Sequence, residues 1–213
     1  MVLTVCSIVG KTKNERVTTM QVNGTEVLFT EMLLLAKEAD ACKEDLRILR
    51  ALGEKRVLKH KKLAEWFCWY AKDVIKGRWP EGEEAIAKDA NWSYHYAKDV
   101  IKDRWPKGEE VIAKDANWSC LYARDVIKDR WAEVEEAIAK DANYSYQYAK
   151  DVIKGRWPEG EEAIAKDAEW FCWYARNVIK GRWPEGEETI AKDTECAYLY
   201  AKDVIKGRWP DNK

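Results

Sequence analysis

The fold of this chain is decided by the stretch Tyr70-Ala-Lys-Asp-Val-Ile-Lys-Gly-Arg-Trp-Pro-Glu-Gly-Glu-Glu-Ala-Ile-Ala-Lys-Asp89. The stretch returns with few changes at a period of 26 residues, from Tyr96, Tyr122, Tyr148 and Tyr174, and it begins once more at Tyr200. Self-similarity with a period between about 20 and 50 residues is typical of stacked repeat proteins. The sequence therefore predicts that residues 64–213 form a row of repeated units.

Each repeat carries the start and stop signals of two helices. Asp89 is placed to cap a helix from Ala90 to Lys102, and Pro106 stands where a second, shorter helix would begin. Gly or Asp follows the first helix in every copy and is expected to stop it: Gly77, Asp103, Asp129, Gly155, Gly181 and Gly207. A helix of about eight residues does not persist alone in water, so the two helices must pack as a pair. We predict an α-solenoid of six helix-turn-helix repeats: 64–89, 90–115, 116–141, 142–167, 168–193 and a truncated 194–213.

Two details of the repeat bear on its packing. Trp92, Tyr96, Ala97, Val100 and Ile101 are spaced to form one apolar stripe on the longer helix. The third copy has Ala132 in place of the Pro and Val134 in place of the Gly. We expect this change to let the longer helix run on or to alter the turn, with a local change of curvature.

Residues 1–63 predict a small α+β segment. Asn23-Gly24 is a hairpin signal between the β-prone residues 17–22 and 25–29, and helices are expected over about 30–40 and 43–52. A terminal repeat needs a cover for its apolar face, so this segment is expected to be an N-terminal cap. An independent functional domain is the alternative.

Neither part of the chain has the large excess of basic residues that is expected of a dedicated nucleic-acid-binding domain. Residues 1–63 carry 12 Lys/Arg against 8 Asp/Glu, and the repeats carry 25 against 30. The densest basic run, from Lys55 to Lys62, is interpreted as a solvated connector, with a phosphate-binding patch as the alternative. No stretch has the length of a membrane span or the form of a signal peptide, so a cytoplasmic location is expected.

The cysteines are interpreted as packing residues rather than as disulfides. Cys68, Cys120 and Cys172 occupy one position in alternate repeats, which places them about 20 Å apart if helices stack at about 10 Å, whereas a disulfide needs Cα atoms within about 7 Å. In the full row, Cys alternates with Tyr: Cys68, Tyr94, Cys120, Tyr146, Cys172 and Tyr198. Such alternation of small and large residues predicts interdigitation between successive repeats.

Candidate binding residues are those that vary while the rest of the repeat stays constant. One position of the longer helix reads Trp69, His95, Leu121, Gln147, Trp173 and Leu199. Helical geometry places this row on the polar face, almost opposite the apolar stripe, where large apolar residues are candidates for contact with a partner protein. The alternative is that Trp69 and Trp173 cover a neighbouring turn or the cap.

A second row of six arginines lies next to a constant Trp in every repeat: Arg78, Arg104, Arg130, Arg156, Arg182 and Arg208. A single-stranded nucleic acid or tRNA could follow such a row through stacking and cation–π contacts. However, a Glu such as Glu83 stands near each of the first five, so an intramolecular Arg–Glu pair beside a packed Trp is favoured.

No pattern predicts catalysis. The two histidines, His60 and His95, lie in unrelated contexts, and no Gly-rich phosphate loop, nucleophile elbow or metal-ligand pair occurs. We therefore expect neither an enzyme nor a bound metal or cofactor.

The string Tyr-Ala-x-Asp-Val-Ile-Lys-Gly-Arg-Trp-Pro-Glu resembles tandem 26-residue helical repeats in uncharacterised proteins of tailed bacteriophages, over residues 64–213. The resemblance implies a phage origin and a host-cell setting, and it transfers no catalytic residue. The leading hypothesis is a protein-binding repeat scaffold that engages a host factor, with inhibition of host defence as the narrower version. Nucleic-acid binding along the Arg–Trp row and self-assembly into a homo-oligomer through the C-terminal repeat are the alternatives.

Overall fold

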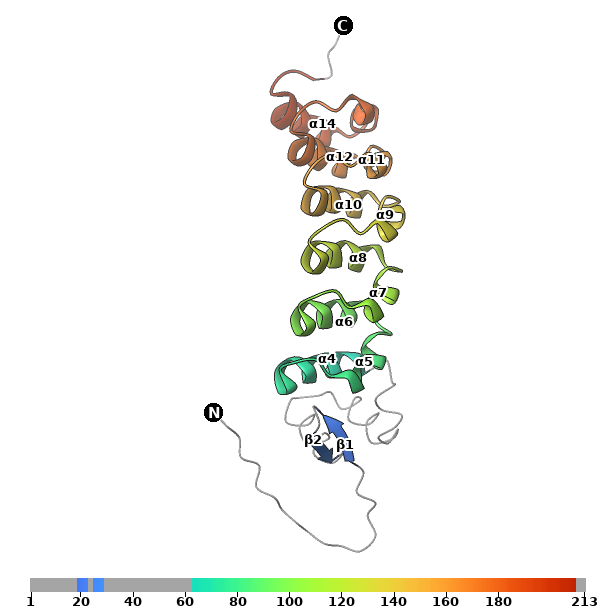
Figure 1. Ribbon diagram of the computed structural model, residues 1–213. Helices are drawn as coiled ribbons and strands as arrows, with labels where there is room; N and C mark the ends of the chain where they lie inside the picture. Colours follow the sequence, from blue (N-terminus) through green and yellow to red (C-terminus); the bar gives the residue numbers. More distant parts are fainter. Residues whose placement is uncertain (1–18, 23–24, 29–62, 210–213) are drawn as a thin grey trace, which may run out of the picture. The chain divides into compact units, whose positions relative to one another are not determined.

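The computed structural model describes residues 19–22, 25–28 and 63–209, which fall into two units, 1–57 and 58–213 (Figure 1). In the first unit, β1 (Thr19–Val22) and β2 (Thr25–Leu28) pair antiparallel, with Thr19 opposite Leu28 and Val22 opposite Thr25. The predicted turn at Asn23-Gly24, the helices expected over 30–52 and the basic run from Lys55 to Lys62 lie outside the described residues. The role of this segment as a cap stays a prediction.

The second unit is built of repeated helix pairs. The longer member of each pair is an α-helix that continues into a π-helical segment, and the shorter member follows after a turn. The longer members are α4 (Ala64–Trp69) with η2 (Tyr70–Ile75), α6 (Ala90–His95) with η3 (Tyr96–Ile101), α8 (Ala116–Tyr122) with η4 (Ala123–Ile127), α10 (Ala142–Tyr148) with η5 (Ala149–Ile153), α12 (Ala168–Tyr174) with η6 (Ala175–Ile179) and α14 (Thr194–Tyr200) with η8 (Ala201–Ile205). The shorter members are α5 (Pro80–Ile86), α7 (Pro106–Ile112), α9 (Ala132–Ile138), α11 (Pro158–Ile164) and the 3₁₀ turn η7 (Pro184–Gly186) with α13 (Glu187–Ile190).

Successive pairs pack against one another in sequence order. Each of the helices α4, α6, α8, α10, α12 and α14 contacts the next in this series, and each shorter helix packs on the longer helix that precedes it (Figure 1). The repeat therefore produces a series of similar layers, each packed on the next.

Helix starts are set by aspartate caps, as the sequence predicts. The Asp89 carboxylate accepts a hydrogen bond from the backbone N–H of Trp92 at 3.1 Å. The same cap recurs at Asp115, Asp141, Asp167 and Asp193. Each cap satisfies one of the backbone donors that a helix N-terminus leaves unpaired.

Helix ends differ from the prediction. The residue that turns the chain is the lysine before the expected Gly or Asp, and in all six copies it has the left-handed conformation, with φ between 57° and 60°: Lys76, Lys102, Lys128, Lys154, Lys180 and Lys206. Its backbone N–H donates to the carbonyl oxygen five residues earlier, as in the 2.7 Å bond from Lys102 to Ala97. This widened last turn is the end of the π-helical segment.

The third repeat keeps the shape of the others despite its two substitutions. The long helix ends at Ile127, and α9 begins at Ala132, so the expectation that the helix could run on through the turn is wrong. Trp131 has φ −123° and ψ 86°, close to the −128° and 90° of Trp105 before a Pro. The turn therefore does not require the Pro.

The predicted apolar stripe is only partly the core. Tyr96 and Ala97 are fully buried, but Trp92, Val100 and Ile101 are half-buried. The stripe assumes 3.6 residues per turn, and a π-helical segment has a longer turn, so Val100 and Ile101, beyond the start of η3, rotate away from the expected face.

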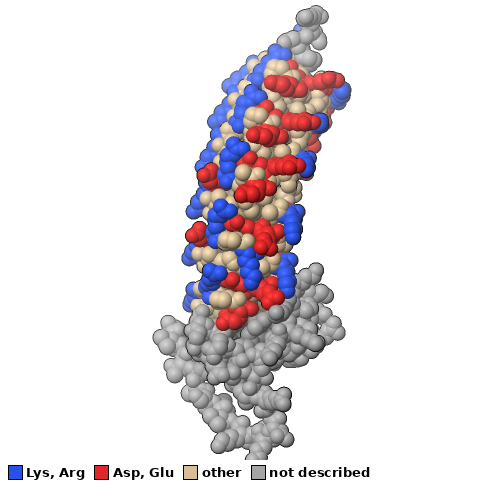
Figure 2. All heavy atoms as spheres, turned by 45° about the vertical axis from the view of Figure 1, so that its right-hand side comes forward, with Lys and Arg blue, Asp and Glu red and all other residues tan. Residues whose placement is uncertain are grey.

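Charged side chains are sorted along the repeat unit. Figure 2 shows Lys and Arg along both edges of this unit, with most of the Asp and Glu between them. The pattern follows from the repeat, since a charged position in one copy recurs in the next.

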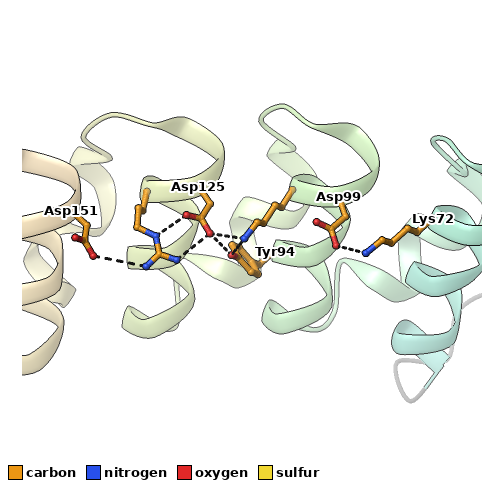
Figure 3. Close-up of polar contacts among 7 residues, drawn as sticks. Lys72, Tyr94, Asp99, Asp125 and Asp151 are labelled. Atoms are coloured by element: carbon orange, nitrogen blue, oxygen red, sulfur yellow. Dashed lines mark hydrogen bonds and ion pairs between the residues drawn. The ribbon is translucent and has the colours of Figure 1, made fainter.

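One set of charges forms a ladder between repeats (Figure 3). Lys72 pairs with Asp99 of the next repeat at 2.8 Å, and Lys98 pairs with Asp125 at 2.7 Å. Arg124 to Asp151 at 3.9 Å and Arg176 to Asp203 at 2.9 Å continue the series. Between the fourth and fifth repeats the acidic position is Asn177, which donates a hydrogen bond to the Tyr146 hydroxyl at 2.8 Å.

Candidate protein-binding surface

The row of variable residues lies on the long helices, and its exposure changes along the stack. Its first four members are half-buried: Trp69, His95, Leu121 and Gln147. The last two are exposed, Trp173 by 43% and Leu199 by 39%. The first four members are therefore less exposed than expected for residues on a polar face, and their role in binding stays a prediction.

The half-buried members contact neighbouring side chains. The Trp69 ring lies 6.4 Å from that of Trp66, and the His95 ring lies 6.2 Å from that of Trp118 in the next repeat. Gln147 donates to the side-chain oxygen of Asn143 at 2.7 Å. Burial lowers the pKa of His95.

The exposed members lie at a pocket between the fifth and sixth repeats. Trp173 and Leu199 line this pocket, which has a volume of about 390 Å³, together with Cys172, Cys196 and Arg176. The Arg176 guanidinium lies 5.8 Å from the Trp173 ring centre, within cation–π range. The pocket thus combines an apolar wall with a charged rim.

Tyr198 is a further exposed aromatic residue of the last repeat, outside the lining of this pocket. It is 63% exposed, whereas Tyr94 and Tyr146 at the same repeat position are 4% and 7% exposed. The Tyr94 ring packs 5.5 Å from Trp118, and the Tyr146 ring 5.6 Å from Trp170, both in the next repeat. The sequence did not identify Tyr198 as a surface residue, because the alternation of Cys and Tyr at this position predicts packing between repeats.

The alternation itself is confirmed as packing in the inner repeats. Cys68 and Cys120 are buried, as are Tyr94 and Tyr146. Burial raises the pKa of both thiols to about 12, which keeps them protonated and unreactive near neutral pH.

The arginines of the Arg–Trp row are bound within the chain. Arg104 reaches both carboxylate oxygens of Glu109, at 2.9 and 2.8 Å, so the intramolecular pair that the sequence favoured is confirmed. The same bidentate pair occurs at Arg78, Arg130, Arg156 and Arg182. Arg208 makes no such pair among the described residues.

Each of these pairs belongs to a clamp between two repeats. The Tyr122 hydroxyl accepts from the backbone N–H of Trp105 at 2.7 Å and donates to Glu109 at 2.9 Å. The clamp recurs at every junction, around Tyr96, Tyr148, Tyr174 and Tyr200. The adjoining Trp side chains of the first five repeats are at most 4% exposed, so their faces are not available to stack on bases.

Comparisons with known proteins name no relative. No family model, curated protein or solved structure matches this chain. Within the described residues, no group of three or more His, Cys, Asp or Glu side chains is placed to hold a metal ion. None of the helices in the described part of the chain has the length and apolar character needed to cross a membrane.

Proposed function

We propose that this protein is a non-enzymatic binding scaffold, in which the repeats form an α-solenoid that presents its C-terminal layers to a partner protein. One observation carries the proposal. Of the large apolar side chains that are exposed among the described residues, Trp173, Tyr198 and Leu199 belong to the last two repeats, where Trp173 and Leu199 line the same pocket, and the fourth, Val74, belongs to the first. We call these three residues the apolar patch.

The chemistry of the apolar patch fits a protein partner. Trp and Tyr are the residues most often found as binding hot spots, because they bury a large area and keep a polar atom for hydrogen bonding. The adjoining pocket is rimmed by Glu169, Glu195 and Arg176. Such a site takes an apolar side chain at its centre and polar groups at its edge.

The resemblance to phage repeat proteins supplies the setting of this proposal. The partner would be a host protein met in the host cytoplasm, and inhibition of a defence factor is the narrower form. In this proposal the N-terminal residues 1–63 close the first repeat as a cap.

The test compares capture of host proteins by three forms of the full chain. Trp173→Ala/Leu199→Ala removes the centre of the apolar patch, and Val74→Ala removes an exposed apolar side chain elsewhere. We expect a partner identified with the wild type to bind the double variant at least tenfold more weakly and the Val74 variant unchanged, with equal helical content by circular dichroism. Equal binding by all three forms would exclude the patch.

Self-association is a second candidate that one observation favours. The face around Tyr198 is the one that the following repeat covers at Tyr94 and Tyr146. A second copy that covered it would give a dimer that Tyr198→Ala weakens. A monomer at high protein concentration in sedimentation velocity would dispose of this candidate. The nucleic-acid alternative along the Arg–Trp row has no such support, because its arginines are paired in the first five repeats and its tryptophans are buried there.

A further inference from the structure

The six lysines that end the long helices hold an unusual backbone conformation. All have φ between 57° and 60°, where a side chain other than glycine is disfavoured. Glycine is the common residue at this position of a helix end. In four repeats a glycine comes one residue later, where it is not needed: no left-handed φ occurs there, and a Cβ at Gly77, Gly155, Gly181 or Gly207 would meet nothing within 4 Å.

This order is the reverse of what helix termination alone favours. A residue that stays in a strained conformation where a simpler residue would relieve the strain is a candidate for a functional role. The lysine is the same in all six repeats, while the following residue changes between Gly and Asp. Helix termination does not explain the choice of lysine, and its charge is a property that distinguishes it from glycine.

These lysines are not held in ion pairs by the neighbouring groups. In the second repeat, Lys98 is paired with Asp125 and Arg104 with Glu109. The six lysines are exposed, and none forms an ion pair among the described residues. Since they end stacked helices at the same position, they give one row of uncompensated positive charge, spaced by about the 10 Å between packed helices.

Two of these lysines line a hollow on the stack. Lys128 and Lys154 border a space of about 380 Å³, together with Lys98, Arg124, Val152 and two aspartates. Both aspartates are already engaged: Asp125 accepts from Lys98 and Arg124, and Asp151 lies 3.9 Å from Arg124. The hollow therefore offers two unengaged ammonium groups to an anion.

We propose that this row, which we call the lysine edge, binds the phosphodiester backbone of a nucleic acid without reading its sequence. Uncompensated lysines in a row are what a phosphate polymer requires. No aromatic residue lines the hollow, so bases have no surface there on which to stack. The inference is independent of the apolar patch and differs from the Arg–Trp alternative in the residues that it uses.

The test replaces two of the lysines with glycine, which removes their positive charge and the strain of their left-handed backbone conformation. In Lys128→Gly/Lys154→Gly, glycine accepts the left-handed conformation, so the variant is expected to unfold at a higher temperature than the wild type. Loss of binding therefore cannot be attributed to misfolding. The matched control is Lys140→Ala/Lys166→Ala, which removes the same charge from the same repeats at lysines paired with Glu136 and Glu162.

Binding is measured by fluorescence anisotropy with a labelled 30-nucleotide oligo(dT) and with a 30-base-pair duplex, between about 20 and 200 mM NaCl. For the single strand, we expect the negative slope of log K against log salt to become shallower by about 1.4 in the glycine variant, since each lost phosphate contact contributes about 0.7. The control should keep the wild-type slope. Three results would overturn the proposal: no binding by the wild type, equal losses in both variants, or binding to anionic vesicles in place of both oligonucleotides.

Discussion

At the scale of single residues, two glycines of the fourth repeat have opposite roles. Gly155 faces open space, whereas a Cβ on Gly160 would lie 2.5 Å from the Trp157 ring and 2.9 Å from the Cβ of Ser145. We expect Gly160→Ala to lower the free energy of unfolding by about 1–3 kcal/mol, the usual cost of overpacking, and Gly155→Ala to change it by less than about 1 kcal/mol. Urea denaturation of the two variants measures the difference.

The third repeat shows how the structure accommodates a side chain at the position of Gly160. Val134 occupies the position of Gly160 and is buried. The indole N–H of Trp157 is buried without a partner in the described structure, and that of Trp131 is not, which indicates a different placement of the Trp131 ring. If Gly160→Ala costs as little stability as Gly155→Ala, the Trp157 ring can shift to the side as the Trp131 ring does. In that case the steric role of Gly160 is wrong.

His95 makes stability depend on pH. Burial, with a smaller contribution from Lys98, holds its pKa below the usual 6.5. The unfolded chain therefore binds more protons than the folded one as the pH falls through 6.5, so the folded state loses stability in that window. His95→Leu introduces the residue found at the same position of the next repeat, Leu121. We expect this variant to show a smaller decrease in melting temperature between about pH 7.5 and 5.5 than the wild type. An equally steep decline in both proteins would contradict this assignment.

At the scale of elements, the ladder between long helices has a break that one substitution should close. Asn177→Asp would let Tyr146 donate to a carboxylate and Lys150 pair across the junction, as Tyr94 and Lys98 do with Asp125. Because the site is partly exposed, we expect a gain of only about 0.5 kcal/mol, smaller at 1 M NaCl. Lys150→Gln in the same chain should cancel the gain. A gain that survives both changes would have another cause.

Helix starts could be predicted from the sequence, and helix ends could not. Asp89 and Pro106 mark starts because the carboxylate caps backbone donors and the ring fixes φ. Lys102 carries no comparable signal, since lysine is common in the last turn of any helix. The π-helical segment is equally invisible to a 3.6-residue pattern, and for this reason the pattern places Val100 too deep.

The candidate site could be predicted only in part for a related reason. The variable row identified Trp173 and Leu199, which are exposed, but it included Trp69 and His95, which pack against neighbouring rings. Exposure at one repeat position depends on the side chains of the next layer, and these differ between copies. Tyr198 shows the same dependence, because its burial requires a following layer that the described residues do not provide.

At the scale of the whole repeat unit, stability should fall toward the last layer. In a stack, each layer is held by its neighbours, so a layer that is covered on one side opens first. The segments Tyr148–Ile153 and Tyr200–Ile205 have the same sequence, Tyr-Ala-Lys-Asp-Val-Ile, and therefore nearly equal intrinsic exchange rates. In the first segment Tyr148 and Ala149 are both buried, and in the second only Tyr200 is. We expect the amides of the second segment to exchange at least tenfold faster by mass spectrometry. Equal protection would mean that the layers unfold as one unit or that another molecule covers the last one. Dilution separates these cases, because only a bound copy would be released and speed the exchange.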